Sequence, residues 1–358
     1  MACLCGIGAV AFALGIALGD TSEPSPNAAS RLGLEQLAGQ RVVVGFPGDD
    51  VPVAVERMVR RGQVAGAILF AANLPSRDAG RRLVRELQAI PRPPGLRDPL
   101  LVMTDQEGGL VKRIGGAPTA SAAEMAARGP AFSRAQGART AANLLDLGVN
   151  VDLAPVLDVA RPGGTIAETD RGFGSTPEQV EAHALPFAEA LQAGGVAATA
   201  KHFPGLGSAR LNTDFAVQRV GLSKEELRGI DEAPYRSFVA AGGKMVMLGT
   251  AIYPAFSPKP AAFARPIATE ELRTRLGFEG VSITDALGTV AVRDFGGPAK
   301  AGLAAAGAGV DLLLFTDYRE GARAQRALLR HLRSRPPARE AFEASAGRVL
   351  RLRHGLGS

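Results

Sequence analysis

The chain has 358 residues, of which 46% are apolar, a composition that supports a sizeable core and excludes disorder over most of the length. Its formal charge is +6 and its pI is near 9.7, but Trp is absent and Tyr scarce, so it lacks the aromatic-plus-basic stripe of many nucleic-acid-binding proteins. Ten arginines lie between Arg319 and Arg353 and predict a solvated face of terminal helices. We therefore expect no nucleic-acid partner.

The first nineteen residues, MACLCGIGAVAFALGIALG, carry no charge and precede a polar Pro/Ser stretch. This pattern predicts a signal peptide or membrane anchor over residues 1–19 and a polar linker over 20–34. A start codon that cuts into a longer signal is the alternative. We expect an exported protein, extracellular or attached to the outer face of the cell membrane. Because Cys3 and Cys5 are the only cysteines, the folded body has no disulfide and no thiolate metal site.

Short apolar runs then alternate with longer helical patterns, which is typical of a parallel sheet built from strand–helix units. Thr176 with Pro177 opens one helical pattern, and Gly148 and Gly195 stand where helices end. The eight predicted strands are residues 41–47, 64–70, 100–105, 149–156, 196–203, 244–253, 280–286 and 310–317.

Eight such units predict an α/β fold, a (β/α)8 TIM barrel, as a single domain over residues 35–358. A dinucleotide-binding sheet would need the pattern G-x-G-x-x-G after its first strand, and the sequence there is GFPGDD. The barrel is therefore preferred over an open doubly wound sheet.

Polar residues end most of the predicted strands, where a barrel of this kind builds its active site. They are Asp105, Asp158, Lys201, His202, Thr250, Asp285 and Asp317. Any one acid could instead cap the following helix, and this interpretation stays open for Asp158 and Asp317. Together the residues predict an acid-rich pocket, which suits sugar hydroxyls and glycosidic chemistry. A divalent metal on Asp105, Glu107 and Asp285 is the alternative, but no close H-x-H or D-x-D cluster supports it, so we expect no metal and no cofactor.

Six motifs resemble the landmarks of family 3 glycoside hydrolases, specifically the single-domain bacterial β-N-acetylhexosaminidases. They are VMTDQEGGLVKRI, NVDLAPVLDV, RGFGS, AKHFPGLG, VMLGTAIYP and LGFEGVSITDALG, in the order of that family. The resemblance covers roughly residues 35–320 and implies the barrel that strand counting predicts independently. It also implies hydrolysis of terminal β-linked N-acetylglucosamine or a related β-glycoside from cell-wall or chitin-type oligosaccharides, by a monomer.

The resemblance implies a role for each matching residue. The aspartate of the TDAL motif, Asp285, is the nucleophile of a retaining mechanism. The side chains expected to bind the sugar are Asp105, Arg113, Arg171, Lys201 and His202. The family usually continues DQEGG with Arg-Val-x-Arg, so the basic residue expected at Leu110 is missing here.

The family's acid/base dyad is also missing. The hexosaminidases read KHFPGHG, four residues, then Asp-Ser-His, whereas this chain has Leu206 for the first His and Asn212, Thr213 and Asp214 at the dyad positions. No histidine lies between Gly205 and Ile230. Three interpretations stay open: Asp214 is the proton donor, the protein binds wall sugar with little or no turnover, or the altered loop admits phosphate or another acceptor.

Overall fold

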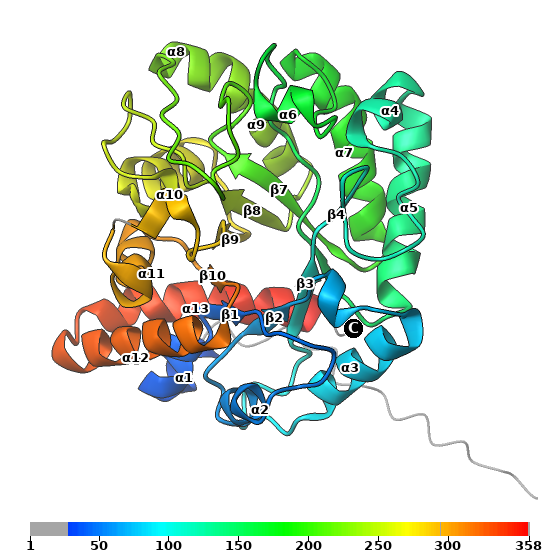
Figure 1. Cartoon of the computed structure of the whole chain (residues 1–358). Coiled ribbons are helices and arrows are strands. Elements are labelled where there is room, and N and C mark those ends of the chain that lie inside the picture. Colours follow the sequence, from blue (N-terminus) through cyan, green and yellow to red (C-terminus); the bar gives the residue numbers. More distant parts are fainter. Residues whose placement is uncertain (1–27, 294, 357–358) are drawn as a thin grey trace, which may run out of the picture.

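Eight parallel strands form one sheet that closes into a barrel (Figure 1). The structure is a computed structural model that describes residues 28–293 and 295–356. The strand order is β10-β1-β2-β3-β6-β7-β8-β9. A parallel bridge between Ile283 and Leu312 joins the two end strands, and the Leu312 amide donates to the Ser282 carbonyl at 2.9 Å. The strands are β1 (Val42–Val44), β2 (Gly66–Ile68), β3 (Leu101–Thr104), β6 (Val151–Asp152), β7 (Ala197–Phe203), β8 (Met245–Leu248), β9 (Val281–Thr284) and β10 (Leu313–Phe315).

The predicted barrel is thus confirmed, and each of the eight predicted strand ranges contains one observed strand. Helices cover the outside of the sheet (Figure 1). They are α1 (Leu34–Gly39), α2 (Val53–Arg60), α3 (Arg77–Ala89), α4 (Ala122–Ala127), α5 (Pro130–Leu145), α6 (Thr165–Glu168), α7 (Pro177–Ala193), α8 (Lys224–Glu226), α9 (Ala233–Ala240), α10 (Val290–Arg293), α11 (Gly297–Ala308), α12 (Tyr318–Ser334) and α13 (Ala338–Gly355). The remaining helical elements are three short 3-10 helices, η1 (Ala29–Arg31), η2 (Ala71–Asn73) and η4 (Ala261–Phe263), and two π-helices, η3 (Leu227–Asp231) and η5 (Pro266–Arg275).

The apolar residues form two layers because successive side chains of a strand point to opposite faces. Val43 of β1 belongs to the cluster inside the barrel, whereas its neighbours Val42 and Val44 pack in the layer between strands and helices. The interior cluster also holds Met103 and Met247. This alternation explains why the strands read as unbroken apolar runs, with both faces buried.

Local sequence signals fix several helix ends. The hydroxyl of Thr176 accepts from the Gln179 amide at 3.3 Å and Pro177 opens α7, as predicted. Gly148 and Gly195 have φ of 80° and 90°, the left-handed conformation expected of a glycine after a helix. One boundary differs from the prediction. Ala29 and Leu32 are 3% and 4% exposed, so residues assigned to the linker already pack on the barrel.

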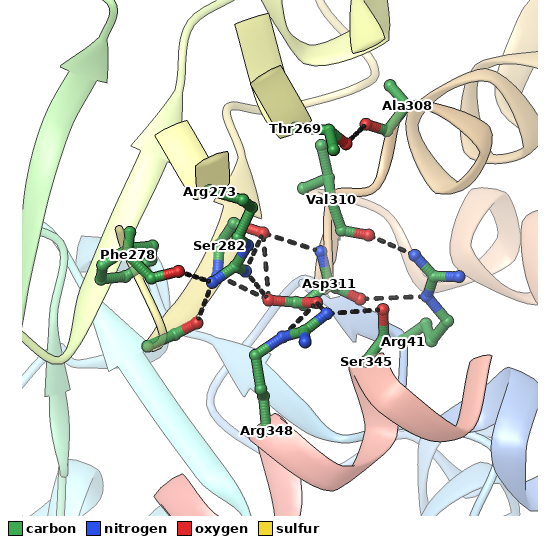
Figure 2. A network of polar contacts seen from close by, with 11 residues as sticks. Arg41, Thr269, Arg273, Phe278, Ser282, Ala308, Val310, Asp311, Ser345 and Arg348 are labelled. Atoms are coloured by element: carbon green, nitrogen blue, oxygen red, sulfur yellow. Dashed lines mark hydrogen bonds and ion pairs between the residues drawn. The ribbon is translucent and has the colours of Figure 1, made fainter. Parts of the chain in front are cut away.

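A buried ion cluster ties the first, last and next-to-last strands to α13 at the N-terminal end of the barrel (Figure 2). The Asp311 carboxylate accepts from the Ser282 amide at 2.9 Å, from Arg348 Nη2 at 2.7 Å and from Arg273. Arg41, just before β1, donates from Nε to the Asp311 carbonyl at 3.3 Å. Burial disfavours a charged Asp311, but Arg273 and Arg348 outweigh it and hold the pKa of Asp311 below its ordinary value.

The prediction of a solvated arginine face is correct for part of the set and wrong for two residues. Arg353 is 1% exposed and donates from Nε to the Pro99 carbonyl at 2.9 Å and from Nη1 to Gln40 Oε1 at 2.6 Å. Arg348 turns inward to Asp311. Both side chains lie on the inner face of α13, where backbone carbonyls and a carboxylate replace water as partners.

Among residues 28–293 and 295–356, no helix combines the length and apolar character needed to cross a bilayer. The predicted signal or anchor, residues 1–19, lies outside the described residues.

Candidate active site

A pocket of about 410 Å³ opens at the C-terminal ends of the barrel strands. It lies where the barrel rule places active sites. Its walls come from β7 itself, from residues that directly follow β3, β9 and β10, and from the loops after β6 and β7. All seven side chains predicted for the site line this pocket: Asp105, Arg113, Arg171, Lys201, His202, Asp214 and Asp285.

Four of the pocket residues form one cluster of ion pairs. Lys201 Nζ lies 2.7 Å from Asp105 Oδ1 and 2.6 Å from Glu107 Oε1. The Glu107 carboxylate also accepts two bonds from Arg171, one from Nε and one from Nη2, both at 2.8 Å. These charge-assisted contacts hold the two cations in fixed positions on the wall of the pocket.

The pKa shifts keep this cluster charged. Burial alone would neutralise Lys201, but Asp105 and Glu107 outweigh it and raise the pKa of the ammonium group. Burial likewise opposes ionisation of Glu107, but Lys201 and Arg171 lower its pKa well below the usual range. Lys201 and Glu107 therefore both stay charged in spite of their burial.

The sequence predicts Glu107 only as a possible metal ligand, whereas the structure shows that it pairs with two cations of the pocket. It is 6% exposed and is the common partner of Arg171 and Lys201. Its position two residues after Asp105, on the short hairpin of β4 (Gln106–Gly108) and β5 (Val111–Lys112), was the available signal. The hairpin itself was not predicted. Leu110 is 77% exposed at its turn, and Arg113 reaches back to within 3.8 Å of Asp105.

A histidine and a buried aspartate organise the loop after β7. His202 Nδ1 lies 2.8 Å from Asp158 Oδ2, and Asp158 Oδ1 accepts from the amides of His202 at 3.1 Å and Leu206 at 2.7 Å. A Cβ at Gly207 would lie 1.8 Å from the Val159 carbonyl oxygen, so only glycine fits this approach. The bonds of Asp158 and the close approach of Gly207 together hold the KHFPGLG loop against the segment that follows β6.

The two carboxylates predicted to be catalytic approach the pocket from different elements. Asp285 follows β9, and its Oδ1 accepts from the Ala286 amide at 2.7 Å. Asp214 stands on the long loop after β7, where its amide donates to Asn212 Oδ1 at 2.8 Å and its carbonyl accepts from the Val290 amide at 3.3 Å. Partial burial and then the charge of Asp285 raise the pKa of Asp214 above its ordinary value.

The remaining polar strand ends do not line the pocket. Asp317 caps α12, because its side chain accepts hydrogen bonds from the amides of Arg319 at 2.7 Å and Glu320 at 3.2 Å. The helix-cap interpretation is therefore correct for Asp317. Thr250 is fully buried. Asp158 caps no helix and acts through His202 and its loop.

No group of three or more His, Cys, Asp or Glu in the described part of the chain has a metal-binding arrangement. At the pocket, Asp105 and Glu107 are instead ion-paired with Lys201.

A barrel with paired carboxylates in a pocket at this end is an arrangement that enzymes cleaving carbohydrates use. Residues 34–352 match the model of the glycosyl hydrolase family 3 N terminal domain. The chain belongs to glycoside hydrolase family 3.

Individual relatives agree with the family. An uncharacterized secreted glycosyl hydrolase of Arthroderma benhamiae is 39% identical over 77% of this chain and 80% of its own length. A beta-hexosaminidase of Alkalilimnicola ehrlichii is 34% identical over 81% of this chain and 84% of its own. The solved structure of a family 3 beta-N-acetylglucosaminidase from Paenibacillus sp. superimposes with a TM-score of 0.85 at 32% identity; 91% of this chain is matched, which spans 64% of that enzyme.

Proposed function

We propose that the protein is a retaining exo-glycosidase that hydrolyses terminal β-linked N-acetylglucosamine, or a related β-glycoside, from cell-wall or chitin-type oligosaccharides. The observation that carries the proposal is the pocket itself, in which Asp285 and Asp214 stand beside the cluster of Lys201, Arg171 and their carboxylates. The relatives named above as a beta-hexosaminidase and a beta-N-acetylglucosaminidase support the choice of sugar.

The proposed reaction has two steps. The Asp285 carboxylate attacks the anomeric carbon and forms a glycosyl ester, while the Asp214 carboxylic acid gives its proton to the departing glycosidic oxygen. Asp214, now a carboxylate, takes a proton from water, which attacks the same carbon and releases Asp285 and the free sugar. Net retention follows from the two displacements.

The environment of Asp214 supports its role as the acid. A proton donor must stay protonated near the working pH, and the pocket raises the pKa of Asp214 by partial burial and by the nearby charge of Asp285. Leu206, which replaces a family histidine, is 2% exposed and gives the pocket an apolar lining, so Asp214 is the titratable side chain that the altered loop brings to the pocket.

The sugar-binding roles are proposed from the fixed donors. Lys201, Arg171 and His202 each have a carboxylate partner that holds the side chain in place before substrate arrives. Such preorganisation lowers the entropic cost of binding. Arg113 and Asp105 complete the set on the hairpin side of the pocket.

Two further assignments belong to the same proposal. Residues 1–19 act as an export signal or anchor and the first part of residues 20–34 as the linker, so that the enzyme works extracellularly or at the outer face of the membrane on wall-derived sugars. The Arthroderma relative is described as secreted, which supports export. We propose that the enzyme acts as a monomer.

The test compares an activated aryl β-N-acetylglucosaminide with chitobiose. Asp285→Asn should abolish both reactions. Asp214→Ala should slow chitobiose hydrolysis roughly 10²–10⁴-fold and spare the first step on the aryl substrate, whose leaving group needs no proton. Equal loss on both substrates would remove Asp214 from the acid role. A rate that rises with added phosphate or sugar acceptor would instead indicate transfer, and no turnover of any aryl β-glycoside would indicate a sugar-binding protein.

A further inference from the structure

A groove of about 430 Å³ lies between α12 and the segment formed by α1 and α2, away from the active site. Four arginines line it, Arg61, Arg326, Arg330 and Arg333. All four are exposed, and none has an ion-pair or hydrogen-bond partner for its guanidinium group within residues 28–293 and 295–356. Glu35 is the one acid of the groove, and its side chain accepts from Gln63 at 2.5 Å. We call this surface the basic groove.

Several other arginines near the C-terminus do have partners. Arg319 pairs with Asp317, Arg339 with Glu343 and Arg348 with Asp311. Arg326, Arg330 and Arg333 are spaced by four and three residues, so they project from one side of α12. Guanidinium groups gathered in this way bind phosphate oxygens through paired hydrogen bonds.

The basic groove lies toward the end of the barrel opposite the pocket. α12 begins at the rim, since its cap Asp317 directly follows the pocket residue Thr316. With a rise of 1.5 Å per residue, Arg326 lies about 14 Å and Arg333 about 24 Å along the helix from that cap. Arg61, between the end of α2 and the start of β2, marks the same end of the barrel.

The chain enters the described structure beside the same surface. The Ser30 carbonyl accepts from Arg339 Nη2 at 3.0 Å, and the Glu35 carbonyl accepts from Gln325 Nε2 at 3.2 Å. Figure 1 shows α1, α12 and α13 side by side. The part of the sequence that leads to this point contains the uncharged run of residues 1–19. The point where the chain enters the described structure and the basic groove thus lie at one end of the molecule.

We propose that the basic groove docks on the phosphate headgroups of an anionic lipid bilayer. Apolar insertion and electrostatic attraction to anionic lipid are two signals that reinforce one another at a membrane surface. Docking at this end turns the mouth of the pocket away from the bilayer, toward polymers outside it. The inference rests on the groove, on the entry point of the chain and on the proposed anchor role of residues 1–19, and it is independent of the proposed glycosidase activity.

The experiment measures co-sedimentation of the full chain with vesicles of phosphatidylcholine alone and with vesicles that also contain phosphatidylglycerol. Binding to the neutral vesicles measures the contribution of the apolar segment. The ratio of the binding constant for the anionic vesicles to that for the neutral vesicles measures the contribution of the arginines. The triple variant Arg326→Gln/Arg330→Gln/Arg333→Gln should lower that ratio roughly 100-fold, since each basic residue at an anionic surface contributes on the order of fivefold. Added salt should lower the wild-type ratio in the same direction.

A matched control removes three exposed arginines elsewhere on the barrel, Arg85→Gln/Arg139→Gln/Arg219→Gln, with the same change in net charge. Its ratio should stay near that of the wild type, and both triple variants should unfold at the wild-type temperature. An equal fall in the two triple variants would show a net-charge effect and overturn the proposal. Equal binding of the wild type to both vesicle compositions would also overturn the proposal. Stronger binding of the wild type to a soluble polyglycerol phosphate than to vesicles would overturn it as well.

Discussion

Asp158 Oδ2 lies 2.8 Å from Nδ1 of His202, and the other oxygen of the same carboxylate binds the amides of His202 and Leu206. One fully buried side chain therefore fixes both the imidazole and the backbone of the loop that carries it. Because Asp158 does not line the pocket, its effect on chemistry must pass through His202 and through the path of the loop.

Replacing Asp158 with Asn should therefore impair activity without removing a group that touches substrate. Asn cannot supply two carboxylate oxygens to these donors, so a buried donor loses its partner at a cost of about 2 kcal/mol in the free energy of unfolding. Displacement of His202 should lower kcat/KM roughly 100-fold. Steady-state kinetics and urea unfolding measure the two effects. Asp317→Asn, which keeps a good helix cap, should change neither; wild-type kinetics in Asp158→Asn would contradict the positioning role.

Glu107→Gln should weaken substrate binding. The change removes the carboxylate shared by Arg171 and Lys201 and leaves two largely buried cations with less compensation. The free energy of unfolding should fall by about 3 kcal/mol, and KM should rise at least tenfold as both donors lose their fixed positions. Glu124→Gln is a suitable control, because glutamine also serves at the third position of the capping box that Glu124 forms with Ser121. An unchanged KM would show that Glu107 does not position the donors.

Much of the fold could be predicted from the sequence because a parallel barrel leaves a strong local pattern. Each strand is buried on both faces, so its apolar run is continuous, and glycines such as Gly148 mark helix ends. The β4–β5 hairpin could not be found in this way. Each strand has only two or three residues and shows no apolar alternation, and Gln106 holds the hairpin through contacts with Ile114 and Ala117 that only the folded chain brings together.

The candidate site could also be predicted in part from the sequence. Residues at strand ends must share a rim, so Asp105, Lys201 and Asp285 could be grouped from spacing alone. What spacing could not give is the partner of each charge. The inward turn of Arg353 also depends on carbonyl groups at residues 96–99 that lie far away in sequence. A charge count treats that arginine like its solvated neighbours.

The pH dependence of hydrolysis should report the acid role of Asp214. Burial and the charge of Asp285 raise its pKa, so the carboxyl stays protonated to a higher pH than a free aspartate does. Since the protonated form is the active one, kcat on chitobiose should fall as pH rises through this pKa. Asp214→Asn should lack this basic limb. In Asp285→Asn, carboxyl-carbon NMR should show the pKa of Asp214 lowered toward its ordinary value, and an unchanged titration would contradict the coupling.

Asp311→Asn should separate stability from activity. The substitution leaves Arg273 and Arg348 without their buried carboxylate at the end of the barrel opposite the pocket (Figure 2). The loss in the free energy of unfolding should be about 3–5 kcal/mol at neutral pH, with kcat of the folded variant unchanged. The pKa of Asp311 is lowered in the folded state, so its contribution is present above the unfolded pKa of about 3.9 and is lost as pH falls through the folded value. Urea unfolding across pH should therefore show the difference between variant and wild type shrinking in acid, whereas Glu56→Gln, at the exposed pair with Arg60, should leave the midpoint nearly unchanged throughout. A pH-independent difference would assign the stability of this cluster to packing instead of charge.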